Sequence, residues 1–239
     1  MEITDMQIQS LGEMAVQLSF GSTISPQIHQ QVRAVGEYIE AHPFAGYEEC
    51  VLSYTAVTIL YDPFVVRKRE NTENAIQFVM DYAKQAVQHT DMDSVPKADE
   101  VTIPVCYGGD YGPDLEEVAQ TLQMTPEEVV RIHTSGTYLV YMIGFCPGYP
   151  YMGGLDKRLW VSRRKTPRLV IPARSVAIAG QQAGVYPIET PGGWQLLGRS
   201  AVDLFTPDAD TPSLLKAGDI VRFKAIPKEE YKKIRGDRS

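Results

Sequence analysis

The sequence of 239 residues has few cysteines and histidines and no long apolar run, and each shortage excludes a class of protein. Without a run of about 18 apolar residues, no membrane-spanning helix is predicted and no membrane partner is expected. Three scattered cysteines, Cys50, Cys106 and Cys146, argue against a disulfide framework and favour a reducing, cytoplasmic location. The cysteines and the four histidines share no metal-ligand spacing, so no metal site is predicted. The acidic N-terminus carries no signal-peptide pattern.

Positive charge is scarce overall and concentrated in one place. The formal net charge is -7, with 23 Lys and Arg against 30 Asp and Glu. An acidic surface repels phosphate backbones, so no nucleic-acid partner is expected. Residues 157–174, the basic segment, contain seven basic residues and no acidic one. This segment is either a solvated face or a binding site for a carboxylate, a phosphate or an acidic partner surface.

Apolar spacing in the first part of the chain predicts a small α+β domain over residues 1–90. The predicted elements are a strand at 13–20, a helix from Ser25-Pro26 to His42-Pro43, one or two strands at 50–61 and a helix at 72–88. This order indicates an α/β sandwich, with one sheet covered by two helices. The polar stretch 91–100 is predicted to be a domain linker.

The second part of the chain predicts a β-barrel domain over residues 101–227. A strand is predicted at 101–105, and two short helices begin near Pro113 and at Thr125, where Glu128 completes a capping box. Strand-like runs separated by glycine and proline follow at 137–143, 169–179, 184–188, 194–198 and 219–226. This pattern is typical of a closed or nearly closed barrel. The charge run 228–239 is predicted to be a solvated tail.

The aromatic loop, residues 144–151, follows a predicted strand and is dense in glycine, proline and aromatic rings. Glycine supplies positive φ and proline fixes φ, so the loop is compatible with a rigid barrel corner. Its large rings also favour a shaped loop that forms one wall of a cleft, and both interpretations can hold together. Cys146 lies in this loop without an evident activating histidine or helix N-terminus, so no nucleophile is predicted there.

A Pro-Gly-Gly-Trp stretch contains the pattern Gly193-x4-Gly198-Arg199-Ser200, which differs from a phosphate-binding P-loop only by arginine in place of lysine. A P-loop joins a strand to a helix, whereas here the residues after Gly193 are strand-like and no helical pattern follows. We therefore favour a β-turn at Gly192-Gly193 that enters a strand. Arg199 could still contact an anion from that strand.

His133 ends a predicted helix just before the strand that enters the aromatic loop. A lone histidine at that position is typical of a helix C-terminus, where its charge complements the helix dipole. It is also the histidine whose position in the sequence best allows it to reach the loop. It is therefore kept as the candidate for proton transfer.

Three linked motifs resemble the KipI family, also called allophanate hydrolase subunit 1-like, which forms the B subunit of bacterial ATP-dependent 5-oxoprolinase. The family pattern is Gly-Phe-x-Pro-Gly-aromatic, then Pro-Arg with Val-Pro-Ala-Gly-Ser-Val-x-Ile-Ala-Gly, then Pro-Gly-Gly-Trp-x-x-x-Gly-Arg. These motifs stand here at residues 144–149, 167–168 with 171–180, and 191–199. The resemblance covers nearly the whole chain. One departure is Arg174, which adds a bulky cation where the pattern has glycine.

The resemblance implies a small N-terminal α+β domain followed by a cyclophilin-like β-barrel. It also implies two partners, a KipA-like C subunit and a LamB/YcsF-like A subunit. With them the chain would cleave 5-oxoproline to L-glutamate using ATP and magnesium, with no covalently bound cofactor and no activity alone. Phosphorylating the lactam oxygen would make its carbon electrophilic, which calls for cations that hold phosphate and the substrate carboxylate.

The candidate binding residues lie in the aromatic loop, the basic segment and the turn and strands that follow. For substrate or nucleotide binding we predict Gly144, Phe145, Pro147, Gly148, Tyr149, Arg163, Arg164, Arg168, Gln181, Gly192, Gly193, Trp194, Gln195 and Arg199.

Two other functions are weighed against this one. The resemblance also implies inhibition of a sporulation sensor histidine kinase, either beside the enzyme role or instead of it, with the KipA-like partner opposing it. In that case the purified chain alone would slow kinase autophosphorylation. A stand-alone hydrolase is disfavoured, because no nucleophile–base pair, carboxylate dyad or metal set stands out.

Overall fold

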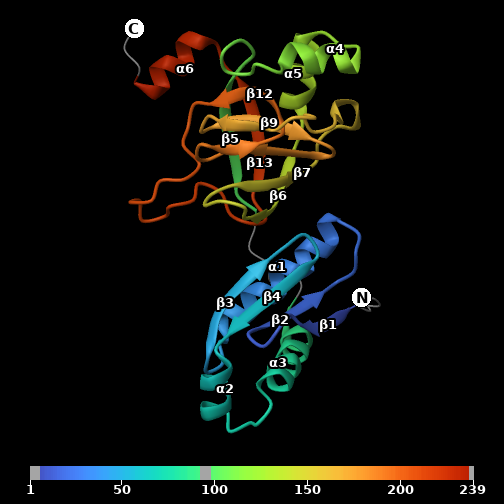
Figure 1. Ribbon diagram of the computed structural model, residues 1–239, viewed down its shortest axis with the longest axis vertical. Coiled ribbons are helices and arrows are strands. Elements are labelled where there is room, and N and C mark those ends of the chain that lie inside the picture. Colours follow the sequence, from blue (N-terminus) through green and yellow to red (C-terminus); the bar gives the residue numbers. More distant parts are fainter. Residues whose placement is uncertain (1–5, 92–97, 237–239) are drawn as a thin grey trace. The chain divides into compact units, whose positions relative to one another are not determined.

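Figure 1 shows the computed structural model, which describes residues 6–91 and 98–236. The chain divides into two compact units, Met1–Lys97 and Ala98–Ser239. Each unit has its own hydrophobic core. Most of the predicted linker, residues 92–97, lies outside the described residues, and its last residue, Glu100, already belongs to a strand.

The N-terminal unit is one antiparallel sheet with helices on it. Its elements are β1 (Gln7–Ser10), β2 (Ala15–Ser19), α1 (Pro26–Ala41), β3 (Tyr47–Leu52), β4 (Ala56–Tyr61), α2 (Pro63–Arg69) and α3 (Ala75–His89). The strand order is β1-β2-β4-β3. Helix α1 packs on β3 and β4, and α3 packs on β1, β2 and α1. Apolar side chains of β2, β4 and these helices bury one core between the layers.

Local sequence signals explain where these helices begin. The Ser25 hydroxyl accepts a hydrogen bond from the Ile28 backbone N–H at 3.2 Å, and Pro26 occupies the first helical position. The short helix α2 was not predicted, because no element was expected between the strands at 50–61 and the helix at 72–88. In the structure the Asp62 carboxylate instead caps α2, accepting from the backbone N–H groups of Phe64 and Val65.

The C-terminal unit is a closed seven-stranded barrel with two strands outside it. The barrel order is β10-β7-β6-β13-β5-β12-β9, and β11 pairs with β8 in a separate ribbon. The strands are β5 (Glu100–Tyr107), β6 (Tyr138–Ile143), β7 (Pro150–Gly153), β8 (Arg168–Ile171), β9 (Ser175–Ala179), β10 (Gln182–Val185), β11 (Thr190–Gly192), β12 (Gln195–Ser200) and β13 (Ile220–Ala225). The expected fold, an α+β domain followed by a β-barrel, is confirmed.

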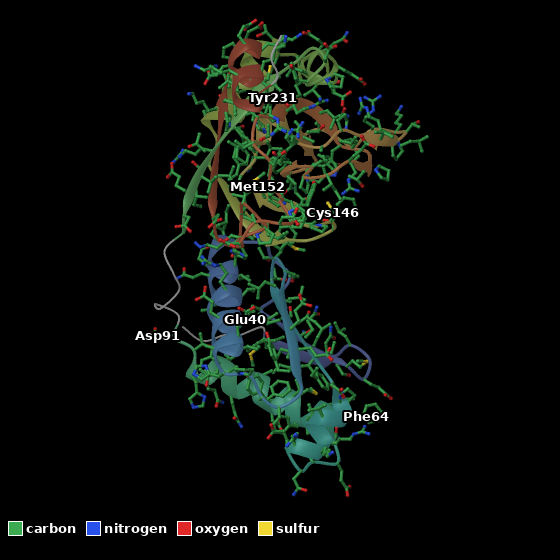
Figure 2. All side chains as sticks on the ribbon, turned by 90° about the vertical axis from the view of Figure 1, so that its left-hand side faces the viewer. Glu40, Phe64, Asp91, Cys146, Met152 and Tyr231 are labelled. Carbon is green, nitrogen blue, oxygen red and sulfur yellow. The ribbon has the colours of Figure 1, made fainter. Side chains whose placement is uncertain are left out.

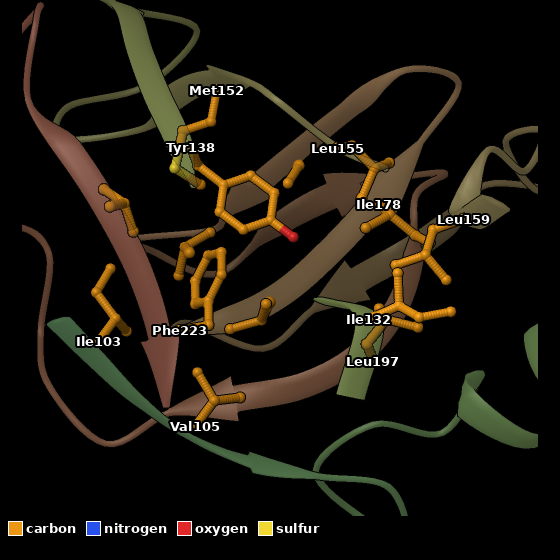
Figure 3. Packing of buried hydrophobic residues seen from close by; sticks show 14 of the residues in the cluster. Ile103, Val105, Ile132, Tyr138, Met152, Leu155, Leu159, Ile178, Leu197 and Phe223 are labelled. Atoms are coloured by element: carbon orange, nitrogen blue, oxygen red, sulfur yellow. The ribbon is translucent and has the colours of Figure 1, made fainter. Parts of the chain in front are cut away.

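Side chains from alternate strand positions fill the barrel, as the period of two requires. Figure 3 shows part of this packing, including Ile103, Val105, Tyr138, Met152, Ile178, Leu197 and Phe223. The helices α4 (Leu115–Leu122) and α5 (Pro126–Ser135) add Leu115, Val118 and Ile132 to the same core. The predicted capping box is present at the start of α5, with Thr125 and Glu128 bonded in both directions.

A second apolar layer lies on the outer face of the barrel. On β9, Val176 and Ile178 belong to the barrel core, whereas Ala177 and Ala179 belong to a separate cluster. That cluster also contains Ile171 of β8, together with Tyr149, Tyr186, Trp194 and Leu196. The β8–β11 ribbon and its aromatic neighbours therefore cover this side of the barrel, and β9 is buried on both faces.

The predicted solvated tail forms a helix over most of its length. Residues Lys228–Arg235 form α6, whose charged side chains are exposed or half-buried, while Tyr231 (Figure 2) is buried. Tyr231 packs with Cys106, Ala201 and Ile226, and Arg235 pairs with Asp203 at 2.7 Å. The apolar face of this helix was hidden in the sequence by its high charge. Residues 237–239 of the predicted tail lie outside the described residues.

Candidate functional site

A small cleft opens on the aromatic layer outside the barrel. Its volume is about 180 Å³, and its lining residues are Phe145, Tyr149, Tyr151, Arg163, Tyr186, Pro191, Gly192, Gly193 and Trp194. They come from four places in the sequence: the aromatic loop, the basic segment, the connection after β10, and β11 with the turn that leads into β12. Barrel closure therefore brings together three segments that the sequence motifs singled out.

The aromatic loop holds its exposed ring in a strained conformation. Phe145 has φ +65, and the Cys146 N–H donates to the Gly144 carbonyl at 2.7 Å across it, which closes a γ-turn. Two more backbone bonds, from Gly144 to Tyr149 and from Tyr149 to Cys146, lock the loop. A non-glycine residue at positive φ costs about 1–3 kcal/mol and concentrates at functional sites. Phe145 is 62% exposed at the cleft. The strained backbone therefore points this ring toward solvent, and core packing does not account for its position.

The floor of the cleft consists of packed aromatic rings. Tyr149 makes edge contacts with Tyr151, Tyr186 and Trp194, with ring centroids 5.0, 5.3 and 6.1 Å apart. Glycine is needed where these rings approach the backbone. A Cβ on Gly192 would lie 2.7 Å from the Tyr186 hydroxyl oxygen, whereas a Cβ on Gly193 would lie 3.7 Å from its nearest neighbour, Pro167.

Arg163 supplies the cleft with positive charge. Its guanidinium carbon lies 5.9 Å from the centroid of the Trp194 ring, a cation–π arrangement. Among the described residues no carboxylate forms an ion pair with Arg163. Trp194 is 5% exposed and fixed by its aromatic neighbours, so it offers the guanidinium a rigid support.

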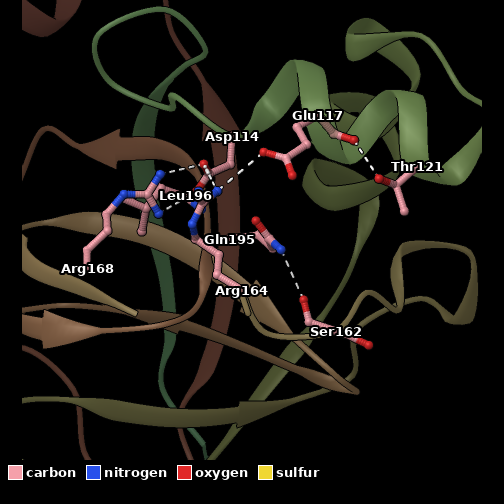
Figure 4. A network of polar contacts seen from close by, with 8 residues as sticks. All are labelled: Asp114, Glu117, Thr121, Ser162, Arg164, Arg168, Gln195 and Leu196. Carbon is pink, nitrogen blue, oxygen red and sulfur yellow. Dashed lines mark hydrogen bonds and ion pairs between the residues drawn. The ribbon is translucent and has the colours of Figure 1, made fainter. Parts of the chain in front are cut away.

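The two neighbouring arginines are held by a buried carboxylate (Figure 4). Asp114 is 2% exposed and accepts from Arg164 at 2.8 Å, from Arg168 through both terminal nitrogens, and from the Leu196 N–H at 2.7 Å. Glu117 adds a longer contact to Arg164, at 3.3 Å. This network fastens the basic segment to β12 and to the start of α4. Asp114 is the N-cap residue of α4, but its carboxylate makes no cap bond, because the two arginines and the Leu196 N–H occupy its oxygens.

A larger groove of about 660 Å³ lies on the other side of Arg163. It is lined by Glu117, Thr121, Leu122, Trp160, Val161, Ser162, Arg163, Arg164, Lys165, Thr166 and Gln195. The Gln195 amide nitrogen donates to the Ser162 carbonyl at 3.0 Å, while its oxygen is buried without a partner among the described residues. Lys165 is exposed, and Arg163 lines both the groove and the cleft.

The predicted binding residues differ in where they lie. Phe145, Tyr149, Arg163, Gly192, Gly193 and Trp194 line the cleft, and Arg163, Arg164 and Gln195 line the groove. Gly144, Pro147 and Gly148 shape the aromatic loop without lining the cleft, and Gly148, at φ +76, packs closely against Phe205. Arg168 is held by Asp114 and lines neither space.

Two further predicted residues lie away from both spaces. Gln181 occupies the exposed turn between β9 and β10. Arg199 extends over the ring of Tyr111, with its guanidinium carbon 5.7 Å from the ring centroid, and Lys228 approaches the same ring at 5.8 Å. The alternative to a P-loop is supported, because β12 runs through to Ser200 as a strand and no helix begins there.

His133 does not reach the aromatic loop, which corrects the expectation for this residue. It is 0% exposed, and its Nδ1 lies 2.8 Å from the Tyr107 hydroxyl. Its ring packs against Phe223 and Tyr138, with centroids 4.6 and 5.3 Å away. Burial lowers the pKa of His133 to about 3. A neutral, enclosed imidazole of this kind supports the core and does not exchange protons with a ligand in the cleft.

Several site residues were not predicted. Tyr186 lines the cleft from the connection after β10, which looks like an ordinary turn, and Asp114 resembles a helix cap. The roles of these two residues depend on contacts between residues far apart in the sequence, so no local signal identifies them. Pro191 lines the cleft from β11 and stands in the Pro-Gly-Gly-Trp motif, although it was not chosen as a binding residue. Arg174, which stands where the family pattern has glycine, has a φ of +68. Glycine adopts this region freely, which accounts for the glycine of the pattern. Its side chain pairs with Asp203 at 3.0 Å instead of approaching the cleft.

Two kinds of feature are absent from the described residues. No helix there is both long and apolar enough to cross a membrane. No group of three or more His, Cys, Asp or Glu side chains in that part of the chain could hold a metal ion.

Known proteins resemble this chain over nearly its whole length. Residues 6–215 match the family described as carboxyltransferase domain, subdomain C and D. The chain is 46% identical to the B subunit of 5-oxoprolinase from Bacillus subtilis (strain 168), over 94% of this chain and 95% of that protein. It is thus a relative of the B. subtilis protein with a distinct sequence.

Solved structures share the fold within longer chains. The crystal structure of TTHA0988 matches with a TM-score of 0.75 and 33% identity, over 89% of this chain but only 40% of that one. The K. lactis urea amidolyase matches with a TM-score of 0.75 over 99% of this chain and 16% of that one, at 18% identity, which concerns the fold alone. From its motifs, its fold and these relatives, the chain belongs to the carboxyltransferase subdomain C and D family and, within it, to the 5-oxoprolinase B subunits.

Proposed function

We propose that this chain is the B subunit of an ATP-dependent 5-oxoprolinase that opens 5-oxoproline to L-glutamate together with a KipA-like C subunit and a LamB/YcsF-like A subunit. The observation that carries the proposal is the 46% identity with a protein named as the B subunit of 5-oxoprolinase, across 94% of this chain. At that identity and coverage, both the barrel and the N-terminal unit are shared with that relative.

The arrangement around Arg163 suits the chemistry of this reaction. A lactam is a stable amide, and transfer of a phosphoryl group to its oxygen activates the ring carbon toward water. That step needs cations for the phosphates and for the carboxylate of 5-oxoproline. Arg163 and Lys165 line the groove, and Arg163 also lines the neighbouring cleft. Glu117 opposes an anion in the groove, although its contact with Arg164 offsets part of its charge.

Two observations support a protein partner, and the second favours a docking surface beside the cleft. In TTHA0988 the matching region is 40% of the chain, so a relative of this fold is covalently joined to further protein. Here, Leu169 and Val170 of β8 are 89% and 54% exposed, on a strand whose neighbour β11 contributes Gly192 to the cleft. Exposed large apolar side chains of this kind favour a protein interface. We assign it to the C subunit.

The test is ATP-dependent glutamate release from 5-oxoproline by a mixture of the three subunits, with each subunit omitted in turn. We expect activity to disappear without this chain and to return when it is added back. Glutamate release at an unchanged rate without this chain would contradict the proposal. Inhibition of a sensor histidine kinase stays a prediction from the family resemblance, to be tested by kinase autophosphorylation with the purified chain.

A further inference from the structure

We propose that the aromatic cleft is the binding site for a small cyclic amide that carries one carboxylate, with the ring held against the aromatic floor and the carboxylate on Arg163. The proposal deepens the proposed function and rests on it for the identity of the ligand, 5-oxoproline. In this arrangement the cleft binds the substrate and the larger groove binds the nucleotide. The reasons are the size, the charge and the shape of the cleft.

The size of the cleft suits a single small ring. Pockets for drug-sized ligands and nucleotides occupy roughly 300–1,000 Å³. The cleft measures about 180 Å³, whereas the groove beyond Arg163 measures about 660 Å³. A five-membered ring with one substituent fits the smaller space. A base with its sugar and phosphates does not.

The charge of the cleft matches one carboxylate. Of the three neighbouring arginines, Arg164 and Arg168 already pair with Asp114, and Arg163 has no carboxylate partner among the described residues. A guanidinium binds a carboxylate through two parallel hydrogen bonds. One such group, supported on the Trp194 ring, provides for a monoanion, whereas a triphosphate needs several cations.

The walls of the cleft favour a flat, mostly apolar ring without repelling the carboxylate. Tyr149, Tyr186 and Trp194 present packed aromatic surface, and Phe145 adds an exposed ring at the rim. Burial raises the pKa of Tyr186 to about 12, so its phenol stays neutral and adds no negative charge near the ligand. Gly192 leaves room for Tyr186, because a Cβ there would lie 2.7 Å from its hydroxyl oxygen.

Tryptophan fluorescence can report ligand binding in the cleft. The chain has two tryptophans. Trp194 lines the cleft and Trp160 lines the groove, so the variant Trp160→Phe retains tryptophan only in the cleft. Fluorescence of this full-length variant is titrated with 5-oxoproline, with 2-pyrrolidinone, which has the same lactam but no carboxylate, and with ATP. We expect a saturable change with 5-oxoproline and binding weaker by about 10- to 100-fold with 2-pyrrolidinone.

Adding Arg163→Gln to that variant should weaken 5-oxoproline binding by the same about 10- to 100-fold and leave 2-pyrrolidinone binding unchanged. The control is Arg158→Gln, which removes the same charge from an arginine that pairs with Asp156 and lines neither space. Thermal unfolding of each variant checks that it is folded. A titration without saturable change, a full effect of Arg158→Gln, or displacement of 5-oxoproline by ATP would each overturn the proposal.

The titration uses this chain alone and needs no catalytic activity, so its result separates the two proposals. Binding that depends on Arg163, together with an inactive three-subunit mixture, would leave the site standing and refute the proposed function. An active mixture together with a titration that shows no saturable change would support the proposed function and refute the binding site. In an active mixture, Arg163→Gln should raise the KM for 5-oxoproline by about 10- to 100-fold.

Discussion

Removing the buried Asp114 carboxylate should strongly destabilise the barrel unit. Asp114→Ala leaves Arg164 and Arg168, whose side chains are 29% and 25% exposed, without their buried partner. Breaking a fully buried ion pair costs about 3–5 kcal/mol, and partial exposure of the arginines places this case at the lower end. The Leu196 N–H also loses its acceptor. We expect a total loss of about 3–4 kcal/mol in the free energy of unfolding.

Glu117→Ala is the matched control. Glu117 pairs with the same Arg164, but its side chain is 66% exposed and the contact is 3.3 Å long. An exposed ion pair of this kind contributes less than about 1 kcal/mol. The assay is urea unfolding of the full chain, followed on the transition of the barrel unit. With a slope of about 2 kcal/mol per molar urea, Asp114→Ala should lower the midpoint by about 1.5–2 M and Glu117→Ala by less than about 0.5 M.

Unfolding midpoints of the two variants that lie within about 0.5 M urea of each other would refute this expectation. That result would mean that the Asp114 network contributes no more than a surface ion pair. The basic segment would then be held on the barrel by other contacts. The position of Arg163 would have to be explained without Asp114.

Three further predictions follow from the described contacts. Gly192→Ala should lower the free energy of unfolding by about 1–3 kcal/mol and weaken binding in the cleft, because its Cβ would meet Tyr186 and Ile171. Gly193→Ala is the control and should change the free energy of unfolding little, because its Cβ would have room. Urea unfolding of both variants measures the difference. His133 has a pKa of about 3 in the folded chain, below that of about 6.5 in an unfolded chain, so only the unfolded chain binds a proton there as the pH falls below about 6.5. The free energy of unfolding should then fall by about 1.4 kcal/mol per pH unit toward pH 3, and His133→Gln should lack this component of the slope; an equal slope in both proteins would contradict the assignment. Leu169→Asp should leave thermal unfolding unchanged, because the side chain is 89% exposed, and should abolish co-purification with the C subunit; retained assembly would refute the docking surface.

The barrel could be predicted from the sequence because strand alternation and glycine–proline turns are local signals. The runs at 137–143 and 219–226 correspond closely to β6 and β13. The capping signals at Ser25 and Thr125 likewise identified the starts of α1 and α5. Helix α6 was missed because its charge run contains only two apolar residues, Tyr231, which is buried, and Ile234, which is exposed. Two residues are too few to establish a helical period.

The candidate site could be predicted only in part. The aromatic loop and the Gly-Gly-Trp turn were recognised, and the structure places them in one cleft with Arg163. The sequence could not distinguish Arg163 from Arg164 and Arg168, because the difference lies in the distant carboxylate of Asp114. His133 was misplaced for a related reason. Its neighbours Tyr107, Tyr138 and Phe223 enclose it only once the barrel closes.

The most direct test of the proposed role is a titration of this chain into fixed amounts of the candidate A and C subunits, with ATP and 5-oxoproline present. We predict that glutamate release is absent without the chain and rises until the chain reaches a fixed ratio to its partners. We also predict that Leu169→Asp shifts this titration to higher concentrations. Glutamate release that is already maximal before the chain is added would contradict this role.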